Sequence, residues 1–439
     1  MAAVKPFRMV HYNGKCASAL NTLITPPYDV ISPEEQEKFY STSPFNIIRL
    51  VLGKQYAEDT DRNNRYTRAA ETLRKWLADG ILVRKDRPGM VIYRMEFDDP
   101  TGERQQLDGI ILLVKVDDYG RGKVLPHEKT YKGPKEDQLN LMRHCRSHLT
   151  PIHGLFEDKE DLVIGEYSKF MERPPEQEAV DANGTVHKTW FVDDERALSA
   201  ISRLLAEKSI FIADGHHRYE TALAYKREMD ASGVNVEGAA DYVMMYLTSM
   251  THPGLTILPA HRMVRGLPEF DLPTIIQRLD PYFHQEALPF DNNNRAEVSQ
   301  RLIERIASYS EIGGKFGMVV QGEQSFRLLR LKDFSAVEPL MDSDIPESLR
   351  ALDVTILREI IIGHGLGMDK EDPHGRIEYT PSISEALDRV LKGEFQVSFI
   401  LNPTRVDQMR SAAELGHKLP HKSTYFFPKI SSGLALNVF

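Results

Sequence analysis

The segment from Ser209 to about Met229 constrains the fold of this chain more than any other. Its first residues, SIFIA, form a short apolar run that predicts a buried strand. Asp214 and Gly215 follow as a turn, and a helix is predicted from Arg218 to about Met229. Phosphate sites are often built on a strand, a tight turn and a helix in this order. The sequence therefore predicts an α/β (α+β) fold with a candidate anion site at the turn.

The turn Asp214-Gly215-His216-His217-Arg218 carries the residue types that such a site needs. Glycine lets a phosphate oxygen approach the backbone, and the N–H groups of a first helical turn point toward an anion that the helix dipole favours. Two imidazoles and a guanidinium add donors suited to phosphate. The alternative is a polar turn that only caps the helix. The flanking strand and helix favour the phosphate interpretation.

Glu128 is the second candidate. It follows a short apolar run and lies between the basic neighbours His127 and Lys129. In phosphoryl transfer, a positioned carboxylate can take the proton from the acceptor hydroxyl. Because most glutamates are surface groups in any fold, the role of Glu128 depends on the resemblance described below.

The length of 439 residues exceeds what a single hydrophobic core usually supports, which predicts more than one domain. We expect an N-terminal α/β domain over residues 1–120, a phosphate-binding core over 121–235 and a C-terminal α/β domain over 236–439 that closes the site. The polar, glycine-rich segment 119–123 suggests the first boundary. Periodicity predicts helices that begin near 33 and cover 66–77, 195–205 and 349–361, and strands at 91–97, 106–116, 242–247, 255–258, 316–320, 326–331 and 396–401.

Several classes of function are disfavoured. The net charge of −9 offers no global field for nucleic acid, and the chain has no apolar run of the ~20 residues that cross a bilayer. We expect no nucleic-acid partner, no membrane and a cytoplasmic location. Two cysteines exclude a disulfide framework. His144 and His148 have the i, i+4 spacing of ligands on a helix face, but no further residues complete a zinc set.

Gly363-His364-Gly365-Leu366-Gly367 looks like a dinucleotide fingerprint, but Met368 stands where the third glycine belongs and no clear strand precedes it. The end of a helix is the better interpretation.

The two motifs resemble the ParB/sulfiredoxin superfamily, most closely its free-serine kinase branch and the large bacterial family related to it. Pro126-His127-Glu128 resembles the catalytic-glutamate motif of that kinase, DGHHR resembles its phosphate loop, and Lys422-Ser423-Thr424 resembles the segment that closes over the amino acid. The resemblance covers about residue 122 to the end. It implies a ParB/sulfiredoxin-like nucleotide-binding core and reversible phosphoryl transfer between ATP or ADP and the hydroxyl of free L-serine.

The resemblance also implies roles for single residues. Glu128 would be the general base, with Asp214 and His217 as further catalytic residues. The phosphate would be held by Gly215, His216, His217 and Arg218, and the substrate by His127, Lys422, Ser423 and Thr424. Mg²⁺ would be carried by the phosphates, with Asp214 as a candidate ligand.

This chain departs from the kinase pattern at two places. Tyr425-Phe426 stands where the kinase has Arg-His, and an aliphatic residue near Ile257 replaces an aromatic one. His261 and Arg262 are candidates to supply the missing substrate contacts. The segment 26–29, PPYD, has no counterpart in the small kinase; it either adds to the substrate pocket or only packs against it, and packing is slightly favoured.

Two other classes of function remain. A ParB-like nucleotide-binding switch or NTPase module would act on DNA or on another protein. Sulfiredoxin-type repair would need a nucleophilic cysteine at the phosphate loop, where this chain has His216. The oligomeric state stays open.

Overall fold

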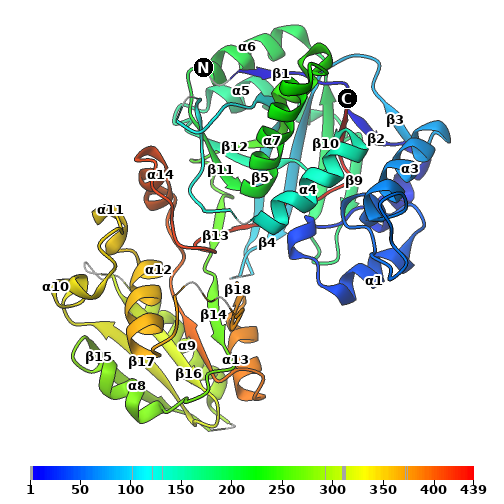
Figure 1. The fold of residues 1–439 in the computed structure, drawn as a ribbon. Coiled ribbons are helices and arrows are strands. Elements are labelled where there is room, and N and C mark those ends of the chain that lie inside the picture. Colours follow the sequence, from blue (N-terminus) through cyan, green and yellow to red (C-terminus); the bar gives the residue numbers. More distant parts are fainter. Residues whose placement is uncertain are drawn as a thin grey trace. The chain divides into compact units, whose positions relative to one another are not determined.

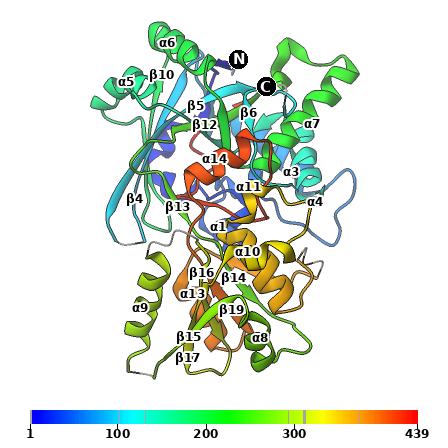
Figure 2. The same ribbon diagram turned by 90° about the vertical axis from the view of Figure 1, so that its left-hand side faces the viewer.

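The computed structural model describes residues 3–100, 102–120, 122–130, 132–291, 293–308, 313–370, 372 and 374–439. The chain forms two compact units (Figure 1, Figure 2). Unit 1 comprises residues 1–126, 130–256 and 426–439, and unit 2 comprises 127–129 and 257–425. This division differs from the expected boundaries near residues 120 and 235, because strands from both sides of residue 120 belong to one sheet.

Unit 1 is built on a mixed sheet of nine strands. Eight of them lie in the order β6-β11-β8-β12-β5-β4-β10-β9, and the ninth, β1, pairs with β5. β11 runs parallel to β6 and β12 runs parallel to β8, whereas the other pairs are antiparallel. The strands are β1 (Val4–Lys5), β4 (Met90–Asp98), β5 (Arg104–Lys115), β6 (Val124–Leu125), β8 (Ile152–Phe156), β9 (Gln177–Val180), β10 (Val186–Val192), β11 (Ile210–Asp214) and β12 (Tyr242–Ser249).

Both faces of this sheet are covered. Along β4, Tyr93 and Met95 enter one hydrophobic core, whereas Met90 and Ile92 enter the other. Successive side chains of a strand point to opposite faces, so a strand buried on both sides reads as a continuous apolar run. The helices of unit 1 are α1 (Pro33–Thr42), α2 (Ile48–Val51), α3 (Arg65–Ala78), α4 (Lys132–Cys145), α5 (Leu162–Ser168), α6 (Glu195–Ala206) and α7 (His216–Ser232).

Local signals located the helix starts of unit 1 well. Ser32 caps α1, and its hydroxyl and the Glu35 side chain form the reciprocal capping box that the sequence S-P-E-E suggests. The expected helices at 66–77 and 195–205 are confirmed as α3 and α6. Two short sheets complete unit 1, one of β2 (Val10–Tyr12) with β3 (Leu82–Arg84) and one of β7 (Ser147–His148) with β21 (Asn437–Val438).

Unit 2 contains a six-stranded antiparallel sheet with the order β15-β17-β16-β19-β14-β18. α9 and α13 cover one face of this sheet, where they share a core with Met263, Phe326 and Ile400 (Figure 2). The strands are β14 (His261–Val264), β15 (Phe283–Pro289), β16 (Lys315–Val320), β17 (Ser325–Leu331), β18 (Ile377–Thr380) and β19 (Val397–Ile400), and the helices are α8 (Leu272–Leu279), α9 (Arg295–Ala307), α10 (Phe334–Val337), α11 (Glu347–Arg350), α12 (Asp353–Ile356), α13 (Ile383–Leu391) and α14 (Val406–Glu414). A further two-stranded sheet pairs β13 (Thr256–Leu258) with β20 (Tyr425–Phe427).

Two local expectations differ from the structure. α4 ends at Cys145 and Ser147–His148 is strand β7, so His144 and His148 do not share a helix face. The expected helix 349–361 is divided into α11, α12 and a π-helical segment, Leu357–Gly365. That segment contains Gly363 and Gly365, which agrees with a helix end rather than a dinucleotide loop. No helix of the described chain is long and apolar enough to cross a membrane.

Candidate functional site

In unit 1, the candidate phosphate loop lies between β11 and α7. Asp214 is the last residue of β11, Gly215 precedes α7 in the left-handed conformation with φ = 94°, and α7 begins at His216. No side chain of the described chain caps this helix start. A Cβ at Gly215 would lie 2.9 Å from both Cζ and Nε of Arg218, so glycine is required for conformation and for space.

Asp214 is held by two cations. Its Oδ2 accepts a hydrogen bond from Nη2 of Arg218 at 2.5 Å, and its Oδ1 accepts one from Nζ of Lys429 at 2.5 Å. Burial alone would raise the pKa of the Asp214 carboxyl, but the attraction of Lys429 and Arg218 outweighs burial and holds this pKa well below its ordinary value. Arg218, Lys429 and Asp214 therefore form one buried ion cluster at the start of α7.

Lys429 was missed by the sequence analysis. It lies in the C-terminal segment 426–439, far in sequence from Asp214, and its side chain is only 13% exposed. The one available signal was its place in KSTYFFPK, just beyond the motif that resembles the substrate segment. His216 is buried and His217 is half-buried at the start of α7.

Gly215→Ala should reveal how tightly the loop is built. We expect the variant to lose about 1–2 kcal/mol of unfolding free energy from the left-handed backbone, and to lose more because Cβ displaces Arg218. Urea unfolding followed by tryptophan fluorescence measures this change in unit 1, which contains both Trp76 and Trp190.

Gly233→Ala is the matched control for Gly215→Ala. Gly233 ends the same helix with φ = 68°, and an added Cβ would meet no atom within 4 Å. The control should therefore show the backbone cost alone. If both variants lost the same free energy, the contact with Arg218 would not matter for stability.

Two buried histidines near this loop stay neutral. Nε2 of His153 lies 2.8 Å from Oγ1 of Thr248, and burial lowers the pKa of His153 to about 3. Burial likewise lowers the pKa of His148 to about 3. The ordinary value is about 6.5, so below that pH the unfolded chain binds protons that the folded chain does not. The stability of unit 1 is therefore complete above pH 6.5 and decreases as the pH falls toward 3.

We expect unit 1 to lose about 2 kcal/mol of unfolding free energy per histidine between pH 7 and pH 5, about 4 kcal/mol for His148 and His153 together. Urea unfolding at the two pH values, followed by tryptophan fluorescence, measures this loss. His153→Gln should reduce it by about half. Equal unfolding free energies of the unsubstituted protein at pH 7 and pH 5 would contradict the prediction.

In unit 2, residues 127–129 lie beside the segment 422–424. The backbone N–H of Leu419 donates to the carbonyl oxygen of His127 at 2.8 Å, and Glu128 forms a parallel bridge with Leu419. Oγ1 of Thr424 lies 2.9 Å from Nε2 of His127 and 3.5 Å from Oε1 of Glu128. Two of the sequence motifs, almost 300 residues apart, therefore meet in one cluster.

Arg262 belongs to the same cluster. Its guanidinium is 4% exposed and donates to the carbonyl oxygens of Ala260 and Lys422. Burial lowers the pKa of Arg262 to about 10, and the attraction of Tyr379 and Glu128 opposes this effect. Lys422 has φ = 54°, a strained backbone conformation of the kind that often occurs at functional sites.

Two neighbouring side chains of unit 2, His261 and Ser423, differ in their hydrogen bonds. Nδ1 of His261 accepts a hydrogen bond from the Leu401 N–H at 3.4 Å, and burial lowers the pKa of His261 to about 3. Nε2 of His261 has no partner among the described residues. The Ser423 hydroxyl donates to the Pro420 carbonyl oxygen at 2.6 Å, which stabilises the loop.

The candidate residues are thus divided between the units. Unit 1 contains all five residues of the phosphate loop, and unit 2 contains the base and substrate candidates, His127, Glu128, His261, Arg262, Lys422, Ser423 and Thr424.

The described residues include no group of three or more His, Cys, Asp or Glu side chains placed to hold a metal ion. Both oxygens of Asp214 contact cations, so Asp214 does not fit a direct Mg²⁺ ligand in this arrangement. A nucleotide phosphate fits better, because the guanidinium of Arg218, the ammonium of Lys429 and the start of α7, which no side chain of the described residues caps, are suited to an anion.

The fold and these clusters define a mixed α/β protein with a candidate anion site at a strand–helix turn. The chain belongs to the family described as "Protein of unknown function (DUF1015)", whose model matches residues 4–355. No curated protein matches the chain.

Among solved structures, the chain is similar to a free serine kinase in complex with AMP, with 15% identity over 75% of this chain and 92% of that chain and a TM-score of 0.35. It is similar to a conserved hypothetical protein from Pyrococcus furiosus, with 13% identity over 72% and 92% and a TM-score of 0.34. A third is C-terminally truncated SbnI from Staphylococcus aureus, with 10% identity over 75% and 87% and a TM-score of 0.35. TM-scores this low define neither fold nor function.

Proposed function

We propose that this protein is a nucleotide-dependent phosphotransferase that acts on the hydroxyl group of a small molecule, with free L-serine as the favoured acceptor and ATP or ADP as the donor. The observation that carries the proposal is the cluster at the start of α7. There Arg218 and Lys429, two cations of the kind that bind phosphate, converge on the carboxylate of Asp214.

Electrostatics and helix geometry support this role for the loop. Guanidinium and ammonium groups donate short, charge-assisted hydrogen bonds to phosphate oxygens. The start of the 17-residue helix α7 contributes the positive end of a helix dipole. Within the proposal, Arg218 and Lys429 bind the phosphate, and Asp214 orients both cations. Gly215, His216 and His217 complete the loop.

The proposed base is Glu128. Its carboxylate takes the proton of the acceptor hydroxyl, and the hydroxyl oxygen then forms a bond to the terminal phosphorus of the nucleotide while the bond from that phosphorus to the bridging oxygen breaks. With ATP, the products are the phosphate ester, ADP and one proton. The hydrogen-bonded neighbours Thr424 and His127 support a fixed position for the Glu128 side chain within unit 2.

Serine is the favoured acceptor because PHE and KST resemble the motifs of free-serine kinases. The buried Arg262 supports an acidic acceptor, because its guanidinium donates only to backbone carbonyls and forms no ion pair with a carboxylate among the described residues. An α-carboxylate would supply that partner.

Phe426, which stands where the kinase has a polar residue, packs edge-on against His153 in unit 1.

Phosphorus NMR of the purified protein with Mg²⁺ tests the proposal directly. Serine is mixed with ATP or ADP, and phosphoserine is mixed separately with ADP or AMP. We expect a phosphoserine resonance to grow or to decline together with a matching change in one nucleotide. Unchanged spectra in every mixture would overturn the proposal of serine as acceptor. Binding of nucleotide together with salt-sensitive binding of DNA would instead support the nucleotide-dependent switch.

A further inference from the structure

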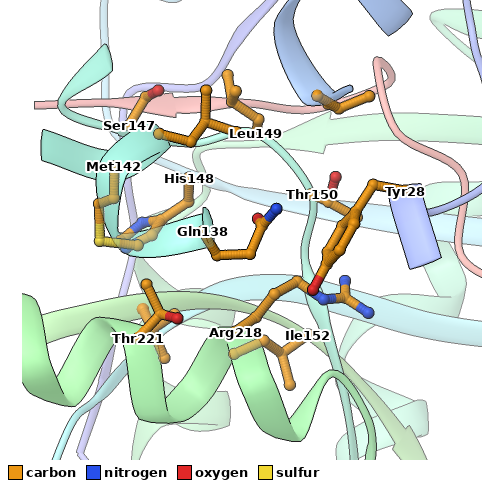
Figure 3. A pocket seen from close by; sticks show the side chains of 13 residues that line it. Tyr28, Gln138, Met142, Ser147, His148, Leu149, Thr150, Ile152, Arg218 and Thr221 are labelled. Carbon is orange, nitrogen blue, oxygen red and sulfur yellow. The ribbon is translucent and has the colours of Figure 1, made fainter. Parts of the chain in front are cut away.

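A cavity in unit 1 lies directly beside Arg218 (Figure 3). The space accessible to the centres of water-sized spheres is about 40 Å³, enough for more than one water molecule. The cavity is therefore larger than a single-water void.

The walls of this cavity are mostly apolar, and no acidic side chain of the described part of the chain lines them. The apolar part comes from α2, α4, β8 and β12 and from the residue that follows β7, and consists of Val51, Leu141, Met142, Leu149, Ile152 and Val243. Among the described residues, Arg218 is the only charged one that lines the cavity, since His148 remains neutral. An ammonium group would find no carboxylate here, which disfavours an amino acid as the occupant.

Neutral polar groups with unused hydrogen-bonding capacity interrupt the apolar wall. The Ser147 hydroxyl is buried and has no partner among the described residues. The Gln138 amide donates to Oδ2 of Asp137 at 3.3 Å, and no hydrogen bond to its carbonyl oxygen is present in the described structure. A buried polar group without a partner is costly, so a ligand that satisfies such groups gains affinity.

An aromatic ring completes the wall at the end that contains Arg218. Tyr28 comes from the short helical turn Tyr28–Val30, and its hydroxyl points toward the Arg218 side chain (Figure 3). The PPYD segment was expected to pack against the pocket, whereas its tyrosine lines the cavity. Aromatic side chains offer a plane on which heterocyclic rings stack.

We propose that this cavity binds the base of the nucleotide whose phosphate contacts Arg218. A neutral heteroaromatic ring matches apolar walls, a stacking partner and a few neutral donors and acceptors. The single cation lies at the end of the cavity from which a phosphate would extend. This inference rests on the proposed function, because it assumes that the anion at Arg218 belongs to a nucleotide.

Calorimetric titration of the full-length protein with AMP and with ribose 5-phosphate tests the inference, because these ligands differ only in the base. We expect AMP to bind at least about tenfold more tightly, the effect of stacking one base. Equal affinities would overturn the base pocket while leaving the phosphate site intact. If neither ligand bound, the proposed function and the inference would both be wrong.

Gln138→Trp should fill the cavity from a half-buried position on α4, where a large side chain is compatible with folding. The variant should bind ribose 5-phosphate as before but lose its preference for AMP. Asn140→Trp is the matched control, because Asn140 lies on the same helix and does not line the cavity. Circular dichroism checks the fold of both variants. Retention of the full preference for AMP in a folded Gln138→Trp variant would overturn the inference.

If Gln138→Trp does not fold, the Ser147→Ala variant tests the inference instead. It removes one buried hydroxyl and adds no volume. Its preference for AMP over ribose 5-phosphate should decrease severalfold, about the effect of one neutral hydrogen bond. An unchanged preference would overturn the proposed contact between the base and this wall.

Discussion

Glu128→Gln should lower the rate of phosphoserine formation by about 10²- to 10⁴-fold and leave the affinity for ADP unchanged. The amide has nearly the size of the carboxylate and can still accept a hydrogen bond from Thr424, but it cannot take a proton from the acceptor hydroxyl. The substitution changes no residue of the phosphate loop, which belongs to unit 1. Phosphorus NMR gives the rate, and calorimetry gives the affinity for ADP.

Glu286→Gln is the control for Glu128→Gln. Glu286 is also a half-buried glutamate of unit 2, and it pairs with Arg305 at the sheet. This variant should keep the full rate. Full activity of Glu128→Gln would rule out its role as base, and loss of ADP binding would show that Glu128 acts on the nucleotide instead.

Lys429→Met should weaken ADP binding by about ten- to a hundredfold, because hydrogen bonds to charged groups contribute about 1.5–3 kcal/mol. Methionine keeps most of the apolar volume but removes one of the two cations that contact Asp214. Of these two cations only Arg218 would remain, and the attraction for a phosphate would be weaker. The remaining affinity should also depend less on salt, since one charge fewer attracts the anion.

The matched control for Lys429→Met is Lys208→Met. Lys208 is likewise a largely buried lysine of unit 1, with its Nζ 3.3 Å from Oδ1 of the buried Asp158. Its loss should cost stability without changing the affinity for ADP. Equal weakening in both variants would show a general effect of losing a buried ion pair. An unchanged affinity in Lys429→Met would exclude Lys429 from the phosphate site.

The strand–turn–helix unit around Asp214 was predicted from its local pattern and is confirmed, with α7 beginning two residues earlier than expected. Strands 91–97 and 106–116 and the pair 316–320 and 326–331 are confirmed as well. The helix expected at 349–361 was only partly correct, because apolar periodicity does not distinguish a continuous helix from shorter ones joined by turns. The strand expected at 255–258 corresponds to β13, which begins one residue later, at Thr256.

The sequence by itself determined the elements whose signals are local. A capping serine, an apolar run or a glycine before a helix acts through neighbours within a few residues, so Ser32, β11 and Gly215 could be recognised along the chain. Glu128 and Thr424 were recognised in two separate motifs. That these two motifs lie close together was implied only by the resemblance to the kinase.

Tertiary structure alone decided which distant residues share a site. The pairing of Lys429 with Asp214 and the cavity between Tyr28 and α4 depend on the order of strands in the sheet and on the return of the C-terminal segment to unit 1. These contacts join residues up to 215 positions apart. Their free energy comes from burial and charge in the folded state and leaves no periodic trace in the sequence.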